Sequence, residues 1–181
     1  MGKIYVALLD RKNKDKASAF GVWEDTPKNR ETAASWDGYE LVDVEFKQAW
    51  DGLFYRPGTA PIEPLEQVKQ KKKDEINAKR NETEQNGFEY MGKVFDSDQV
   101  SCLRMTCAAQ AMALMPVAEP EPTITWTCKD NSTIDLTVSE MQGLVSSLAA
   151  WSNACHEKAT RLKNKIDDAK TNEEVEAIKW D

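Results

Sequence analysis

The feature that most constrains this chain is a short proline-rich segment at residues 57–64. It holds three of the seven prolines and one of the eight glycines. Proline fixes φ and lacks a backbone N–H donor, so neither a helix nor a central strand can run through it. Apolar residues tend to alternate before this segment and recur at intervals of three and four after it. We therefore predict an α+β fold with three parts, namely a small antiparallel β domain at 1–56, a proline linker at 57–64 and a C-terminal helical domain with two β-hairpins at 65–181.

The N-terminal domain is predicted from its strand-like segments. Residues 3–9 and 39–46 place apolar side chains at alternate positions, which is typical of half-solvated strands, and residues 19–23 also have the composition of a strand. A helical turn is expected at 30–35. Asp51-Gly52 is a hairpin-type turn signal. Together these segments predict one small antiparallel sheet.

The C-terminal domain is predicted from helical spacing interrupted by two turn-containing segments. Asp96 or Ser97 is expected to cap its second helix, and Thr137 and Glu140 form a capping box before the longest helix. The segment from Pro116 to Pro122 should end the second helix. The expected order is a helix at 65–86, a hairpin at 88–95, a helix at 101–115, a hairpin at 123–136, a helix at 138–169 and a short amphipathic turn at 175–180.

Two helical segments are unusually polar for their length. Residues 65–86 offer only a narrow apolar stripe, and residues 158–169 continue the longest helix with a similarly thin one. Such helices are marginal alone in water, so each should pack against a partner helix or another copy of the chain. The lysines at 69 and 71–73 are interpreted as a solvated helix face with i, i+4 ion pairs and not as a nucleic-acid site.

Composition argues against several functional classes. The net charge of −7 disfavours nucleic acid and anionic membrane surfaces, and no apolar run approaches the roughly 20 residues that span a bilayer. The four cysteines include no Cys-x-x-Cys pair, and the only histidine, His156, follows Cys155. Neither a metal site nor a disulfide framework is expected, and reduced thiols fit a protein made in a cytoplasm.

A catalytic site is not expected. A Ser-His-Asp or Cys-His unit would have to use His156. Its neighbour Cys155 lies about 100° away around the helix, although Cys102 or Cys107 could meet it in space. No P-loop, dinucleotide-binding or metalloprotease motif is present. We predict that the chain is not an enzyme and needs no cofactor.

Several short motifs resemble known phage sequences: Asp74-Glu75-Ile76-Asn77-Ala78-Lys79-Arg80, Gly87-Phe88-Glu89-Tyr90, Phe95-Asp96-Ser97-Asp98, Ile124-Thr125-Trp126 and Ala154-Cys155-His156. Through them, residues 72–180 resemble an uncharacterised domain found mostly in tail genes of tailed phages (domain-of-unknown-function 4376 type). Residues 48–61 resemble a segment that precedes the proline linker in many tail-associated proteins.

The resemblance implies a structural component of a tailed-bacteriophage tail, at the tail fibre or the tail-tip attachment. Such a protein is made in the host bacterial cytoplasm, resides in the virion tail and acts by protein–protein assembly. Its implied partners are other tail proteins and further copies of itself, as a trimer or ring, and not nucleic acid or membrane. The alternative is a tail-fibre assembly chaperone absent from the mature virion. Its clue would be an exposed apolar groove built from Met105, Met112 and Met115.

If the chain acts by assembly, the N-terminal domain is the expected docking module. Large aromatic side chains dominate interface energetics. The alternative for each ring is a place in the core of the small sheet. The candidate interface residues are Trp23, Trp36, Trp50, Phe54 and Tyr55.

Overall fold

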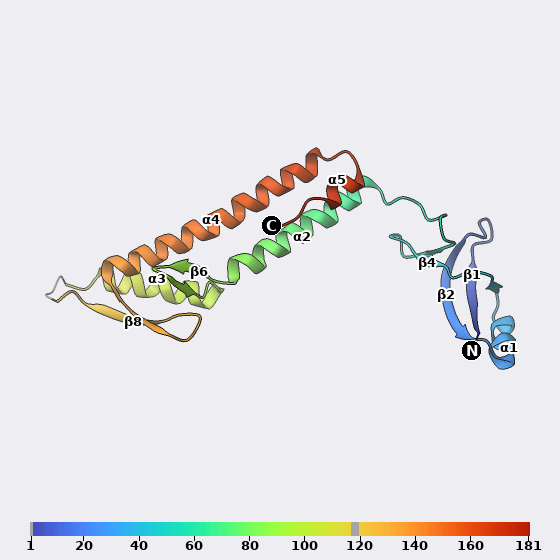
Figure 1. Ribbon diagram of the computed structural model, residues 1–181, viewed down its shortest axis with the longest axis horizontal. Coiled ribbons are helices and arrows are strands. Elements are labelled where there is room, and N and C mark those ends of the chain that lie inside the picture. Colours follow the sequence, from blue (N-terminus) through green and yellow to red (C-terminus); the bar gives the residue numbers. More distant parts are fainter. Residues whose placement is uncertain (1, 117–119) are drawn as a thin grey trace. The chain divides into compact units, whose positions relative to one another are not determined.

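The computed structural model describes residues 2–116 and 120–181 (Figure 1). The chain divides into two compact units, Met1–Pro64 and Leu65–Asp181. Helices and antiparallel strands occur together, which confirms the predicted α+β class. Part of the predicted connection at 116–122 lies outside the described residues.

The first unit is built on a five-stranded antiparallel sheet. The strand order is β3-β1-β2-β5-β4, with β1 and β2 forming the long central hairpin. Alternate residues of β1 enter the interior, so Ile4 and Val6 are buried. The bounds are β1 Lys3–Leu9, β2 Lys16–Glu24, β3 Tyr39–Val42, β4 Lys47–Gln48 and β5 Phe54–Tyr55.

Helix α1 (Pro27–Ser35) begins earlier than the predicted turn at 30–35. Thr26 is extended, and its side chain accepts a hydrogen bond from the backbone N–H of Asn29. Pro27 stands in the first turn, where its missing N–H costs nothing because no helical partner exists there. Thr26-Pro27 has the composition of a pair that interrupts secondary structure, but here it starts helix α1.

The predicted strand at 39–46 is too long. Strand β3 ends at Val42, beyond which the chain leaves the sheet edge. Phe46 is 2% exposed and joins a core with Ala7 and Ala17, while the Asp43 carboxylate accepts a hydrogen bond from Arg56 at 2.9 Å. Phe46 thus enters a core while Asp43 bonds to Arg56 at the surface, and residues 43–46 do not continue the pairing with β1.

The second unit follows the predicted order of helices and hairpins. Figure 1 shows α2 running alongside α4, with α5 near the start of α2. In the first hairpin, Met91 and Gly92 both have positive φ, as a two-residue type I′ turn requires. The bounds are α2 Leu65–Gln85, β6 Phe88–Tyr90, β7 Lys93–Phe95, α3 Gln99–Ala113, β8 Thr123–Thr127, β9 Thr133–Thr137, α4 Val138–Asp168 and α5 Asn172–Glu176.

The helix caps match the prediction in one place and differ in another. Thr137 and Glu140 form the expected capping box at α4. Helix α3 is capped by Asp98, not by Asp96 or Ser97, because the Asp98 carboxylate accepts from two backbone N–H groups. The Ser97 hydroxyl instead donates to the Glu84 carbonyl and accepts from the N–H of Gly87.

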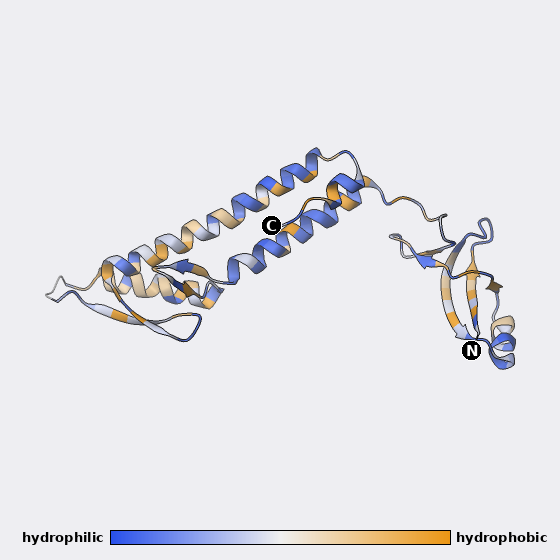
Figure 2. Cartoon of the chain, in the orientation of Figure 1, coloured by the Kyte–Doolittle hydropathy of each residue, from blue (hydrophilic) through white to orange (hydrophobic). Residues whose placement is uncertain are grey.

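The polar helices bury their thin stripes against each other within one chain. Val68 and Ile76 of α2 pack with Leu162 and Ile166 of α4 and with Val175 of α5. Figure 2 shows how few apolar residues α2 contributes. The partner helix that α2 needs is thus α4, so the thin stripes do not by themselves require a second copy of the chain. A separate core joins α3, both hairpins and the first half of α4.

The predicted solvated lysine face is wrong at two positions. Lys69 and Lys72 are 8% and 7% exposed, because both lie where α2 meets the ends of α4 and α5. The Lys69 ammonium donates to the Asp167 carbonyl at 2.9 Å, and the Lys72 ammonium donates to Glu75 at 2.9 Å. Lys73 forms an ion pair with the Asp167 carboxylate at 2.5 Å. Lys72 also lies 3.7 Å from the Glu176 carboxylate of α5, so these lysines link α2 to α4 and α5.

Candidate functional site

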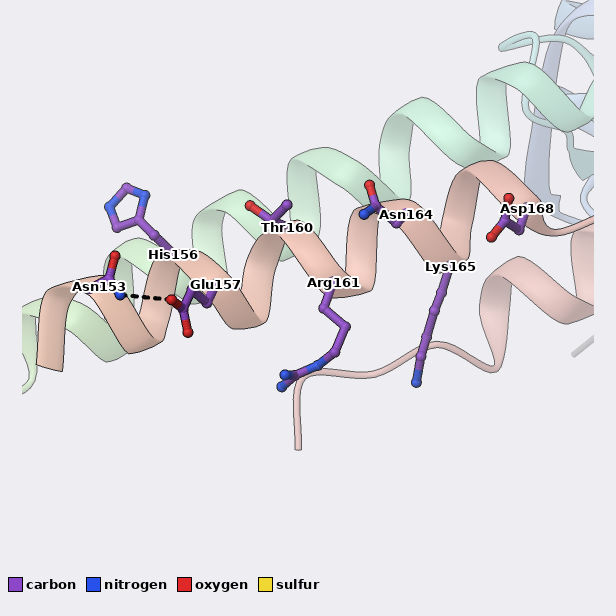
Figure 3. Close-up of a pocket in the computed structure, with 8 residues that line it drawn as sticks. All are labelled: Asn153, His156, Glu157, Thr160, Arg161, Asn164, Lys165 and Asp168. Atoms are coloured by element: carbon purple, nitrogen blue, oxygen red, sulfur yellow. Dashed lines mark hydrogen bonds between the residues drawn. The ribbon is translucent and has the colours of Figure 1, made fainter. Parts of the chain in front are cut away.

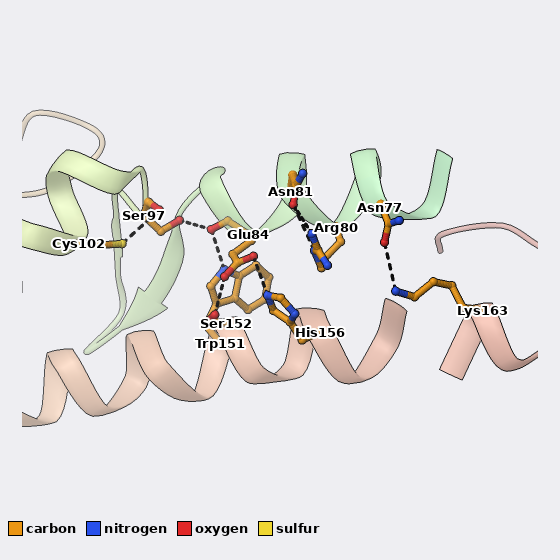
Figure 4. A network of polar contacts seen from close by, with 10 residues as sticks. All are labelled: Asn77, Arg80, Asn81, Glu84, Ser97, Cys102, Trp151, Ser152, His156 and Lys163. Atoms are coloured by element: carbon orange, nitrogen blue, oxygen red, sulfur yellow. Dashed lines mark hydrogen bonds and ion pairs between the residues drawn. The ribbon is translucent and has the colours of Figure 1, made fainter. Parts of the chain in front are cut away.

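A network of polar contacts in the second unit centres on Glu84, near the end of α2 (Figure 4). Its carboxylate accepts a hydrogen bond from the Ser152 hydroxyl at 2.5 Å and lies 3.3 Å from His156 Nε2. Its backbone carbonyl accepts from the Ser97 hydroxyl at 2.5 Å and from the Trp151 indole N–H at 3.3 Å. One residue of α2 therefore binds α4 and the turn before α3.

This Ser-His-Glu set differs from a catalytic triad in its connectivity. In a triad the serine hydroxyl bonds to histidine, and the histidine bonds to the carboxylate. Here Ser152 and His156 lie one turn apart on α4, and both address the carboxylate of Glu84. The serine proton is directed to the Glu84 carboxylate and not to His156, as a triad would require. The geometry suits a link between helices.

The two thiols near this network are poorly suited to nucleophilic attack. The Cys102 thiol donates to the Ser97 carbonyl at 3.3 Å. Burial raises the pKa of Cys102, and the negative charges of Asp98 and Glu84 add to the effect. Burial, followed by the charge of Glu84, also raises the pKa of Cys155. Both groups therefore stay protonated at neutral pH, whereas the thiolate is the reactive form.

A hollow of about 300 Å³ lies beside Glu84, between α2, α3 and α4. Its floor is apolar, and the polar groups around it already bond to one another. Because these polar groups already have hydrogen-bond partners in the protein, they are not available to orient a substrate. The lining residues are Glu84, Ser97, Cys102, Thr106, Val145, Leu148, Ala149 and Ser152.

A second hollow is an open polar face of α4 (Figure 3). All of its lining residues come from this one helix, so no second wall encloses a ligand. Arg161 and Lys165 extend to one side, and Asn153 donates to Glu157 at 2.8 Å. The negative charges of Glu157 and Asp168 balance the positive charges of Arg161 and Lys165. This face is a solvated surface.

The five candidate interface residues do not form one patch. Trp23 and Trp36 meet edge-to-face with ring centroids 5.0 Å apart, and Tyr39 extends the cluster at 5.1 Å from Trp36. Trp36 is the most exposed of the three at 44%. A hollow of about 190 Å³ adjoins these rings. We call Trp23, Trp36 and Tyr39 the aromatic cluster.

The other three candidates lie elsewhere in the first unit. The Trp50 indole donates to the Pro61 carbonyl at 3.1 Å, which ties the proline segment to the sheet. Phe54 packs against a core that contains Phe46. Tyr55 is 6% exposed, and its hydroxyl donates to Asp51 at 2.7 Å. Sequence reasoning selected these residues as large rings but could not separate exposed rings from core rings, because burial depends on strand register.

Glu84 was not among the residues selected from the sequence. It stands in a helix with many carboxylates, and no local pattern distinguishes it from Glu75 or Glu82. Its partners lie 13 to 72 residues away, at Ser97, Ser152 and His156. Two of the motifs noted in the sequence include its partners: Phe95-Asp96-Ser97-Asp98 contains Ser97, and Ala154-Cys155-His156 contains His156.

The described residues, 2–116 and 120–181, also bear on membrane and metal binding. Among them, no helix is both long and apolar enough to cross a membrane. The same residues contain no group of three or more His, Cys, Asp or Glu side chains placed to hold a metal ion.

Residues 67–179 match the family described as Domain of unknown function (DUF4376). The match covers most of the second unit and more than half of the chain, so the chain belongs to this family. No curated protein and no solved structure gives a significant match. The family description assigns no activity, and function has to be inferred from the surfaces of the chain.

Proposed function

We propose that the chain is a structural component of a tailed-bacteriophage tail, in the tail fibre or at the tail-tip attachment, and that it acts by protein–protein assembly. Membership of an uncharacterised domain family and the resemblance of the motifs to tail-associated sequences support this proposal. On this proposal the protein is made in the host bacterial cytoplasm and resides in the virion tail.

The observation that carries the proposal is the aromatic cluster. Trp36 is 44% exposed on a unit of only 64 residues. It lines a hollow that can receive an apolar side chain of a partner. Interface hot spots combine tryptophan or tyrosine with such pockets. Leu41 is another exposed apolar residue of the first unit, at 45%. The second unit would then act as a rigid helical arm, with Glu84 and the lysines of α2 fixing its helices.

The assembly chaperone is less well supported. Its clue was an exposed groove of Met105, Met112 and Met115, but Met105 and Met112 are 0% and 2% exposed. Those two side chains are core residues that pack between α3 and α4. Only Met115, at 49%, is open to solvent.

Quantitative mass spectrometry of purified virions tests the proposal. A tail component gives peptides of this chain in a fixed ratio to other tail proteins, whereas their absence from virions that need the gene for assembly would favour the chaperone. Trp36→Ala should reduce incorporation at least tenfold if the aromatic cluster docks. Val94→Ala is the matched control, since Val94 is 47% exposed but lies in the second unit. Full incorporation of Trp36→Ala would exclude docking through this cluster.

A further inference from the structure

Helix α3 is apolar on its outer side as well as its inner side. Arg104 is the only charged residue from Gln99 to Ala113. The inner face places Met105 and Met112 in the core. On the outer face Val100, Leu103 and Leu114 are 66%, 64% and 87% exposed. Polar residues, among them Arg104 and Gln110, lie on the same helix, but Val100, Leu103 and Leu114 leave large apolar side chains open to water. Exposed apolar patches of this kind often mark a surface that binds a partner.

The exposed side chains form a single line along the helix, which we call the α3 outer stripe. It consists of Val100, Leu103, Cys107, Ala111 and Leu114. All five are exposed. Leu114 continues the helical turn, since its φ and ψ are −92° and −6°. The three-and-four spacing is that of a seam which packs against another helix.

The stripe is symmetric about Cys107. Val100 and Leu114 each lie seven residues from it, and Leu103 and Ala111 each lie four residues from it. A two-fold axis through Cys107 would place Val100 against Leu114 of a second, antiparallel copy. The same axis sets the large Leu103 against the small Ala111 and brings the two Cys107 residues together. Such self-complementarity is what an isologous interface requires.

Charge also favours a second copy at this face. The chain carries a net charge of −7, so two copies repel each other overall. No Asp or Glu occurs between Gln99 and Pro116. The carboxylate of the preceding Asp98 already accepts the N–H groups of Val100 and Ser101. Two acidic chains can therefore approach through α3 without opposing carboxylates.

We propose that the α3 outer stripe is a homodimer interface, in which two copies of the chain pack α3 antiparallel about a two-fold axis at Cys107. A 15-residue helix is only about 22 Å long. The contact is therefore smaller than the roughly 800 Å² per partner of a stable complex, and the dimer is a weak, concentration-dependent one. This interface is independent of the tail assignment and of the aromatic cluster.

Analytical ultracentrifugation of the full chain from about 5 to about 500 µM tests the interface. The expected result is a rise in mass from one chain to two. A short bis-maleimide should cross-link the dimer through Cys107, and Cys107→Ser should abolish this product. Leu103→Glu should weaken association at least tenfold, since it buries a carboxylate. Asn164→Glu adds the same charge to an exposed position of α4 and should leave the dimer intact.

Charge pairing tests the antiparallel direction. Val100→Lys and Leu114→Glu should each weaken self-association, whereas an equal mixture of the two should restore it, because the lysine of one copy then meets the glutamate of the other. A mass of one chain at every concentration would overturn the proposal. A trimer would also overturn it, as would a dimer whose affinity does not change in Leu103→Glu. The same holds if the mixture of Val100→Lys and Leu114→Glu fails to associate. Far-UV circular dichroism of each variant verifies that these exposed substitutions leave the helices folded.

Discussion

Glu84 shows how one residue, through its side chain and its backbone carbonyl, can fix the relative position of several elements. Its carboxylate binds Ser152 and His156 on α4, and its carbonyl binds Ser97 and Trp151. The carboxylate side chain is 27% exposed, so the Ser152 bond is partly shielded from water. The His156 side chain is 52% exposed, so its ion pair adds little.

Glu84→Ala should therefore lower the free energy of unfolding by about 1–2 kcal/mol, mainly through the lost bond to Ser152. Urea unfolding measures the change. Ser152→Ala removes the same bond, so the double variant should cost little more than either single one. Glu82→Ala, which breaks only an exposed pair with Lys79, serves as the control and should cost less than about 0.5 kcal/mol. Fully additive costs of Glu84→Ala and Ser152→Ala would show that the two side chains act separately.

Acid should weaken the first unit through Asp51. The hydrogen bond from the Tyr55 hydroxyl lowers the pKa of Asp51, and Arg56 lowers the pKa of Asp43 in the same way. A carboxyl group with a lowered pKa in the folded state stabilises the fold above its unfolded pKa, about 3.9. That contribution disappears as the pH falls through the folded pKa.

Amide hydrogen exchange should thus show faster opening of β2 and β5 below about pH 4 than at pH 6. Asp51→Asn should flatten part of this pH dependence, because an amide does not titrate. If the dependence were unchanged in Asp51→Asn, the Tyr55 contact would not be its source.

At the scale of the elements, the lysines of α2 act on the end of α4. The last carbonyls of a helix lack helical partners and carry the negative end of its dipole. Lys69 supplies both a donor and a positive charge to the Asp167 carbonyl. Lys69→Met keeps the packing of the stem but leaves that carbonyl without this donor.

We expect Lys69→Met to lower the free energy of unfolding by about 1–2 kcal/mol. Chemical denaturation followed by circular dichroism measures it. Lys79→Met on the same helix breaks only an exposed pair with Glu82 and should change stability by less than about 0.5 kcal/mol. A neutral or stabilised Lys69→Met would mean that burying the ammonium costs as much as its bond contributes.

The sequence predicted those elements whose signals are local. The Thr137–Glu140 capping box, the hairpin at 88–95 and the end of the helix at 65–86 all depend on residues within a few positions of each other. Long-range placement was not predictable. Phe46 has the pattern of a strand residue but enters a core, and Lys69 looks solvated because its partner lies 98 residues away. The Glu84 network escaped detection for the same reason.

At the scale of the whole molecule, each core belongs to one unit. In the part of the chain that the structure describes, the core residues of the first unit lie between Ile4 and Phe54, and those of the second unit lie between Leu65 and Trp180. The unit boundary after Pro64 coincides with the start of α2. The folding free energy of each unit should therefore come mostly from its own residues.

A fragment of residues 65–181 should accordingly fold alone. We expect its far-UV circular dichroism to retain the helical signal and its Tm to fall within about 3 °C of the helical transition of the full chain. The fragment 1–64 should be less stable, because a domain of about 60 residues buries a smaller fraction of its surface.

Ile76→Ala is the internal check, since Ile76 is 0% exposed in a core of the second unit. It should cost about 2–4 kcal/mol in both the 65–181 fragment and the full chain. A 65–181 fragment that melts more than about 10 °C lower would mean that the first unit supplies part of its stability.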